Sequence, residues 1–159
     1  MKIDYKFINN LRSKIRVLER ELDFQLKSET ICCGVTLSQC HIILELAEKE
    51  ESSIKNLSET FGLDKSTLSR TIDLMVEAGY INRNTKKEDR RFLNLSLTGK
   101  GKEKAEFINS QCNKYYAEVM NDIPEDKQQM IFESITLLGN IMAKFRNCCS
   151  NGNEDCCIK

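Results

Sequence analysis

The sequence predicts a mainly α-helical protein that contains one small β-hairpin. Apolar residues recur at steps of three and four through most of the 159 residues, which is the spacing of a buried helix face. The chain has a single proline, Pro124, and only seven glycines, so few positions interrupt helices. The apolar spacing changes to two near residues 80–83 and 92–97, where it predicts a pair of strands.

Length and composition indicate a soluble globular protein. A chain of this length forms one domain, or one domain with an oligomerisation element. The composition of 40% apolar and 30% charged residues is ordinary for such proteins. No segment approaches the roughly 20 consecutive apolar residues that span a bilayer, and residues 1–10 lack the features of a signal peptide. We therefore expect a cytoplasmic protein without a membrane partner.

The first two helices follow from apolar spacing and one capping residue. A long amphipathic helix begins near the N-terminus and should end before residues 30–34, with these apolar positions: Ile3, Phe7, Ile8, Leu11, Ile15, Leu18, Leu22 and Leu26. Thr36 is a suitable N-cap for a second helix, in which Leu37, Cys40, Leu44 and Ala47 share one face. Residues 48–51 should form a polar surface turn.

Two short helices in quick succession predict a helix-turn-helix. Ser52 or Ser53 begins the first, and Gly62 ends it. Asp64 is a good N-cap for the second, which Gly79 closes. The apolar residues that should face inward are Ile54, Leu57, Phe61, Leu68, Ile72, Met75 and Val76. This order of helix, tight turn and capped helix is the outline of a helix-turn-helix.

The predicted hairpin follows directly and carries a charged tip at residues 84–91, so it resembles the wing of a winged helix. Thr98 should cap a long fifth helix that ends near Asn121, and Pro124 lies at the first turn of a sixth. The fold class is thus a winged helix-turn-helix with long terminal helices.

The terminal helices have more apolar face than a small winged helix can cover, which predicts a homodimer. We expect the contacts from Leu11, Leu18, Ile131, Ile135, Leu138 and Ile141. The alternative is that these faces close a core within one chain. The predicted organisation is a dimerisation helix (1–30), a winged helix-turn-helix (31–99), two dimerisation helices (100–147) and a cysteine-rich tail (148–159).

Charge and helix ends point to double-stranded DNA as the partner. The formal net charge is zero, but residues 64–104 contain ten Lys or Arg against six Asp or Glu, a local net of +4. The second helix of the helix-turn-helix begins with short hydroxyls and long cations, which suit base edges and phosphates of a major groove. These residues are Lys65, Ser66, Thr67, Ser69 and Arg70. Arg70 is the expected base contact and Lys65 the expected phosphate contact.

The wing tip supplies a second set of cations: Lys86, Lys87, Arg90 and Arg91. A charged tip is usually only solvated, but its place after a helix-turn-helix favours contact with DNA. Arg91 could enter a minor groove. Asp89 would orient an arginine rather than contact DNA.

These motifs together resemble the MarR family. Residues 89–101, DRRFLNLSLTGKG, are similar to that family's DRR-x₃-L-x-L-T signature. The run from Lys65 to Arg70, then Leu74, residues 77–81 and Arg83, is similar to its recognition helix and wing entry. The resemblance covers nearly the whole chain. It implies a winged-helix homodimer that usually represses transcription and releases a palindromic operator when a ligand, metal or oxidant arrives.

Eight cysteines suggest a chemical signal. Thiolates prefer soft ions such as zinc, copper(I) and arsenite-like species. The candidate effector or metal residues are Cys32, Cys33, Cys40, Cys148, Cys149, Cys156 and Cys157. No cofactor follows from these positions with certainty, because the tail spacing is not that of a structural zinc site. Oxidant sensing is a further possibility, and buried cysteine also serves as a small apolar residue.

Two alternatives to a thiol-responsive regulator remain open. One is a MarR-type regulator of a small organic ligand with incidental cysteines, and the other is a thiol-rich metal-binding module without a DNA role. An enzyme is not predicted, because the sequence lacks a phosphate loop, an HExxH motif, a GxSxG motif and a catalytic triad.

Overall fold

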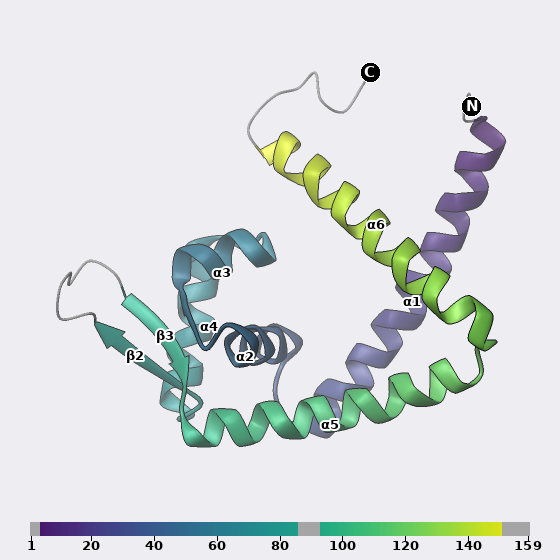
Figure 1. Cartoon of the computed structure of the whole chain (residues 1–159). Helices are drawn as coiled ribbons and strands as arrows, with labels where there is room; N and C mark the ends of the chain where they lie inside the picture. Colours follow the sequence, from purple (N-terminus) through teal and green to yellow (C-terminus); the bar gives the residue numbers. More distant parts are fainter. Residues whose placement is uncertain (1–3, 86–92, 151–159) are drawn as a thin grey trace. The chain divides into compact units, whose positions relative to one another are not determined.

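The structure is a computed structural model that describes residues 4–85 and 93–150. Of residues 29–32, 85, 93 and 146–150 it describes the backbone only. The elements in chain order are α1 (Tyr5–Cys33), α2 (Leu37–Lys49), β1 (Glu51–Ser53), α3 (Ile54–Phe61), α4 (Lys65–Glu77), β2 (Ile81–Thr85), β3 (Leu93–Leu97), α5 (Gly99–Asn121) and α6 (Glu125–Ser150) (Figure 1). The mainly helical class and the hairpin are confirmed.

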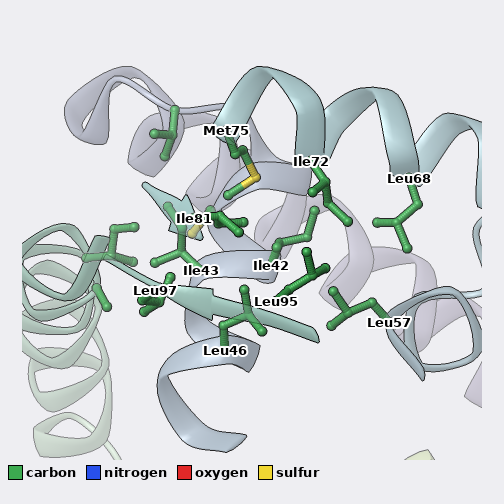
Figure 2. Packing of buried hydrophobic residues seen from close by; sticks show 14 of the residues in the cluster. Ile42, Ile43, Leu46, Leu57, Leu68, Ile72, Met75, Ile81, Leu95 and Leu97 are labelled. Atoms are coloured by element: carbon green, nitrogen blue, oxygen red, sulfur yellow. The ribbon is translucent and has the colours of Figure 1, made fainter. Parts of the chain in front are cut away.

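The chain divides into two compact units, residues 1–113 and 114–159. The first unit contains the winged helix and its core. Figure 2 shows side chains of α4 pointing toward those of α2 and of the strands. Ten large side chains are almost completely buried there: Ile42, Ile43, Leu46, Leu57, Leu68, Ile72, Met75, Ile81, Leu95 and Ile108. At about 25 cal/mol per Å², burial of such side chains supplies most of the stabilisation of a small domain.

The sheet has three strands in the order β1-β3-β2, all antiparallel. Ser52 lies opposite Leu95 and Ile81 opposite Leu97, so the apolar side chains of β2 and β3 face the core together. The prediction that residues 48–51 form a surface turn is wrong at both ends. Helix α2 continues to Lys49, and Glu51 begins β1.

Three further expectations need correction. Helix α1 continues through residues 30–33, and Gly34 with φ +64° follows its end. The buried residues of α2 are Cys40, Ile42, Ile43 and Leu46. Of the predicted face, Cys40 is buried, Leu37 and Leu44 are half-buried, and Ala47 is exposed. The reason is that this short helix packs against both α4 and β3, so its buried arc is wider than one stripe. Pro124 precedes the first residue of α6, and its carbonyl accepts a hydrogen bond from the Lys127 amide.

The capping residues of the winged helix are as expected. Thr36 forms a capping box with Gln39, and Ser53 accepts a hydrogen bond from the Asn56 amide. Gly62 ends α3 with φ +64°, a conformation that costs glycine little. Each cap satisfies helix-end groups that would otherwise lack partners.

The second unit contains the last turns of α5, from Lys114, and α6. Residues 132–145 of α6 are all exposed within this chain, although many of them are large and apolar. No helix in the described ranges is long and apolar enough to cross a membrane.

Candidate nucleic-acid interface

The N-terminus of α4 is held in one conformation by Asp64. The Asp64 carboxylate accepts hydrogen bonds from the Ser66 hydroxyl (2.6 Å) and from the Thr67 backbone amide (2.9 Å). These bonds, above all that from Ser66, hold the pKa of Asp64 well below its usual range. The first turn of α4 is therefore fixed before any ligand arrives.

The next residues of α4 divide between surface and core. Lys65, Thr67 and Arg70 are exposed and Ser69 is half-buried. Leu68 and Ile72 are completely buried and anchor the opposite face. The predicted DNA-contacting residues of α4 thus share the outer side of one helix end. The Ser66 hydroxyl, which we expect to contact DNA, also donates a hydrogen bond to Asp64.

The turn between α3 and α4 is also fixed by local hydrogen bonds. The Leu63 amide donates to the Ser58 carbonyl, and the Ser58 hydroxyl donates to the Leu63 carbonyl at 2.6 Å. A short turn bonded on both sides fixes the direction in which α4 leaves α3. Such a turn is the basis of helix-turn-helix geometry.

An ion pair joins the wing to α4. The guanidinium of Arg83 in β2 contacts the carboxylate of Asp73 in α4. The sequence alone does not predict this pair, because the two residues lie in different elements and their spacing follows no periodic rule. Since β2 leads into the wing, the pair ties the direction of the wing to the helix that carries Arg70.

The C-terminal end of α4 is held by the start of α5. Lys100 Nζ donates to the Ala78 carbonyl at 2.7 Å and lies 4.8 Å from the centre of the Tyr80 ring. A cation at a helix C-terminus is favourable because the last carbonyls carry partial negative charge. A Cβ atom on Gly101 would lie 2.1 Å from the Tyr80 carbonyl oxygen, so only glycine fits this contact.

Lys104 connects the same tyrosine to the end of α1. Its Nζ donates to the Cys33 carbonyl at 3.2 Å and lies near the rings of Tyr80 and Phe107. The Tyr80 ring is therefore near two lysines, one of which is bound to the end of α4 and the other to the end of α1. Neither contact follows from the sequence pattern.

The wing-tip residues Lys86, Lys87, Asp89, Arg90 and Arg91 lie outside the described residues. The structure thus brings the α4 residues of the predicted site together and leaves the wing contacts as predictions.

The cysteines of the first unit are placed in or beside its core. Cys33 and Cys40 are buried with the core side chains, and Cys112 packs against the same cluster. The side chains of Cys32, Cys148 and Cys149 are not described, and Cys156 and Cys157 lie in the final nine residues, outside the described ranges. Within the described part of the chain, no group of three or more His, Cys, Asp or Glu residues is arranged to hold a metal ion.

The predicted dimer residues are accessible on their helices. Leu11 and Leu18 of α1 are 40% and 49% exposed, and Ile135 of α6 is 58% exposed. Leu138 and Ile141 are exposed as well, whereas Ile131 is half-buried. The faces are thus available to a second chain.

Comparison with known proteins finds a family likeness in the winged helix. Residues 35–92, which run from the start of α2 into the wing, match the model of the MarR family. This region of the chain is therefore similar to MarR-family proteins. The HTH-type transcriptional regulator BilQ of Clostridium symbiosum (strain WAL-14163) is 25% identical over 119 residues, which cover 74% of this chain and 83% of that protein.

Solved structures of MarR-type proteins share the fold. A MarR-type regulator of Listeria monocytogenes complexed with 26-mer DNA matches with a TM-score of 0.77 and 21% identity, covering 97% of this chain and 98% of that one. FabT of Streptococcus pneumoniae in complex with DNA matches with a TM-score of 0.72 and 18% identity, covering 89% and 99%. These likenesses support a DNA-binding transcriptional regulator of the MarR type.

Proposed function

We propose that the chain binds a palindromic operator as a homodimer and represses transcription until an effector releases it. The observation that carries this proposal is the exposed cationic surface at the N-terminus of α4, which is fixed by Asp64 and backed by the buried core. The positive end of the α4 dipole adds to the attraction for DNA phosphate.

We assign different roles in DNA binding to the residues of α4. Arg70 contacts base edges in the major groove, where its guanidinium can pair with two acceptors of guanine. Lys65, Thr67 and Ser69 contact phosphates and adjacent base edges, and Ser66 supports the helix end through Asp64. Arg90 and Arg91 of the wing contact the neighbouring minor groove, with Lys86 and Lys87 on phosphate and Asp89 orienting an arginine. The DNA complexes of two proteins with the same fold support this assignment.

The apolar faces of α1 and α6 support dimerisation. Exposed side chains as large as Leu18 and Ile135 are unfavourable in water, and contiguous patches of them mark interaction surfaces. We propose that Leu11 and Leu18, with Ile131, Ile135, Leu138 and Ile141, pack against a second copy. Two α4 helices would then enter successive major grooves about one helical turn apart.

The release signal has two candidate classes. A thiol-reactive metalloid or oxidant would act at Cys32, Cys33 and Cys40 or at the C-terminal cysteines. A small organic ligand is the second class, and one observation favours it: Cys33 and Cys40 are buried among apolar side chains. Arsenite or peroxide should then leave DNA binding unchanged, whereas release that Cys32→Ser with Cys33→Ser abolishes would favour the first class.

Selection from a random duplex library tests the DNA-binding proposal. The full chain should enrich an inverted repeat, and light scattering of the complex should give two chains per duplex. Affinity should fall steeply as salt rises, because each phosphate contact releases counterions. Enrichment of no common sequence, or binding by one chain alone, would contradict the proposal.

A further inference from the structure

A cavity lies at the C-terminal end of α2, between that helix, β1, β3 and the first turns of α5. Its volume is about 640 Å³, within the range of roughly 300–1,000 Å³ that is usual for small-molecule sites. The residues that line it all belong to the first compact unit: Leu46, Ala47, Glu50, Glu51, Ser96, Leu97, Lys102, Ala105, Glu106 and Asn109.

The floor of the cavity is apolar. Leu46, Leu97 and Ala105 are among its lining residues, and all three are buried in the core. Their side chains come from α2, β3 and α5, so three elements of the winged helix meet at this point. A ligand with a hydrocarbon or aromatic body would bury apolar surface against this floor.

The walls of the cavity are negatively charged. Glu50, Glu51 and Glu106 line it together with one cation, Lys102. The C-terminal end of α2 contributes further partial negative charge. Glu51 accepts a hydrogen bond from the Asn94 amide at 2.9 Å. Among the ion pairs of the described residues, none engages Glu50 or Glu106, so both carboxylates remain available to a ligand.

The arrangement of these carboxylates selects the kind of cation. A metal ion needs several ligand atoms converging on one point, and in the described part of the chain no three acidic or other metal-ligating side chains converge in this way. Carboxylates around an apolar floor suit an extended organic cation better than a single metal ion.

We propose that this cavity binds a small organic cation with an apolar body, of the arylalkylammonium class. The apolar body lies on Leu46, Leu97 and Ala105, and the ammonium group faces Glu50 and Glu106. This binding is a property of the protein alone and does not depend on DNA.

Calorimetric titration of the full chain with 2-phenylethylammonium tests the proposal. The matched probes are 2-phenylethanol, which is neutral, and 3-phenylpropionate, which is an anion. The cation should bind at least about ten-fold more tightly than the neutral probe, since two carboxylates near the charge each add roughly five-fold even at the dielectric of bulk water. Equal binding of the three probes, or binding of none of them, would overturn the proposal.

Variants locate the site. Glu106→Gln and Glu50→Gln should each weaken cation binding about five-fold. Glu103→Gln is the matched control, because Glu103 lies on the same helix but does not line the cavity. Ala47→Phe places an aromatic ring at an exposed wall position and should abolish binding while the helical circular dichroism stays unchanged. Full binding by Ala47→Phe, or an equal loss in Glu103→Gln, would place the ligand elsewhere.

Any effect of the bound cation on DNA affinity rests on the proposed function. If the protein binds the cation but selects no duplex, the proposed function is contradicted and the cation site is supported. If the protein selects an operator but binds no cation, the cation site is contradicted and the proposed function is supported.

Discussion

The guanidinium of Arg83 in β2 forms an ion pair with the carboxylate of Asp73 in α4. The two side chains are 31% and 49% exposed, so the pair contributes little to the free energy of unfolding, in the range of about 0–1 kcal/mol for surface pairs. The pair instead fixes the position of one element relative to another. It connects β2, which leads into the wing, with α4, which carries Arg70.

A double-mutant cycle on DNA affinity tests this role. Arg83→Ala should weaken operator binding about five-fold or more in the wild-type background but less than about two-fold in the Asp73→Ala background, because the pair is already broken there. Fluorescence anisotropy with the selected duplex measures all four proteins. If Arg83→Ala costs the same affinity in both backgrounds, Arg83 contacts DNA itself and does not act through Asp73.

The contact between Gly101 and Tyr80 predicts a strong effect of one methyl group. Gly101→Ala should lower the free energy of unfolding by about 1–3 kcal/mol, because the added Cβ would meet the Tyr80 carbonyl oxygen. Gly99→Ala is the matched control, since a Cβ there meets no atom within 4 Å. Urea unfolding of both variants is the measurement, and equal stability of the two would show that the end of α4 and the start of α5 are not packed as described.

Truncation of two residues of α4 should change the free energy of unfolding to very different extents. Ile72 is completely buried, so Ile72→Ala should cost about 2–5 kcal/mol of stability. Leu74 is 58% exposed, and Leu74→Ala should change stability by less than about 0.5 kcal/mol. The same unfolding experiment compares them, and a large loss in Leu74→Ala would mean that α4 is rotated from its described orientation.

The lowered pKa of Asp64 predicts a dependence of α4 stability on pH. A carboxyl group whose pKa is lower in the folded state stabilises that state at pH values above its unfolded pKa of about 3.9. This contribution is lost as the pH falls through the folded pKa. Asp64→Asn should therefore be less stable than the wild type at neutral pH, and the difference should shrink in acid.

The hydrogen bond from Ser66 is the largest cause of that lowered pKa. Ser66→Ala should therefore raise the pKa of Asp64 toward its ordinary value, as followed by carbon-detected NMR titration of the carboxyl group. Thr71→Ala is the control, because the Thr71 hydroxyl donates to the Thr67 carbonyl and not to Asp64. An unchanged pKa in Ser66→Ala would mean that this hydrogen bond does not form.

Local signals were sufficient to predict most of the winged helix from the sequence. Thr36, Ser53 and Asp64 are N-caps, and Gly62 ends α3, because each role depends on a few neighbouring residues. Strand β1 could not be predicted in this way. Its three residues carry no alternation, and they form a strand only because β3, distant in the sequence, pairs with them.

The candidate site was predictable to the extent that it lies on one helix. The exposed positions of α4 follow from helical periodicity once Leu68 and Ile72 are assigned to the core. The ion pair of Asp73 with Arg83 and the hydrogen bond of Lys100 to Ala78 depend on how separate elements pack. The hydrogen bond from the Ser66 hydroxyl to Asp64 is a local capping contact that the helical spacing alone does not predict.

The affinity of Arg70→Ala for the selected duplex tests the central proposal most directly. The wild type should bind with a steep dependence on salt, and Arg70→Ala should lose about 1–3 kcal/mol of binding free energy and relax the preference at one base pair. Arg20→Ala removes another exposed arginine, from α1, and should bind as the wild type does. Wild-type affinity and specificity in Arg70→Ala would contradict the assignment of α4 as the DNA-contacting helix.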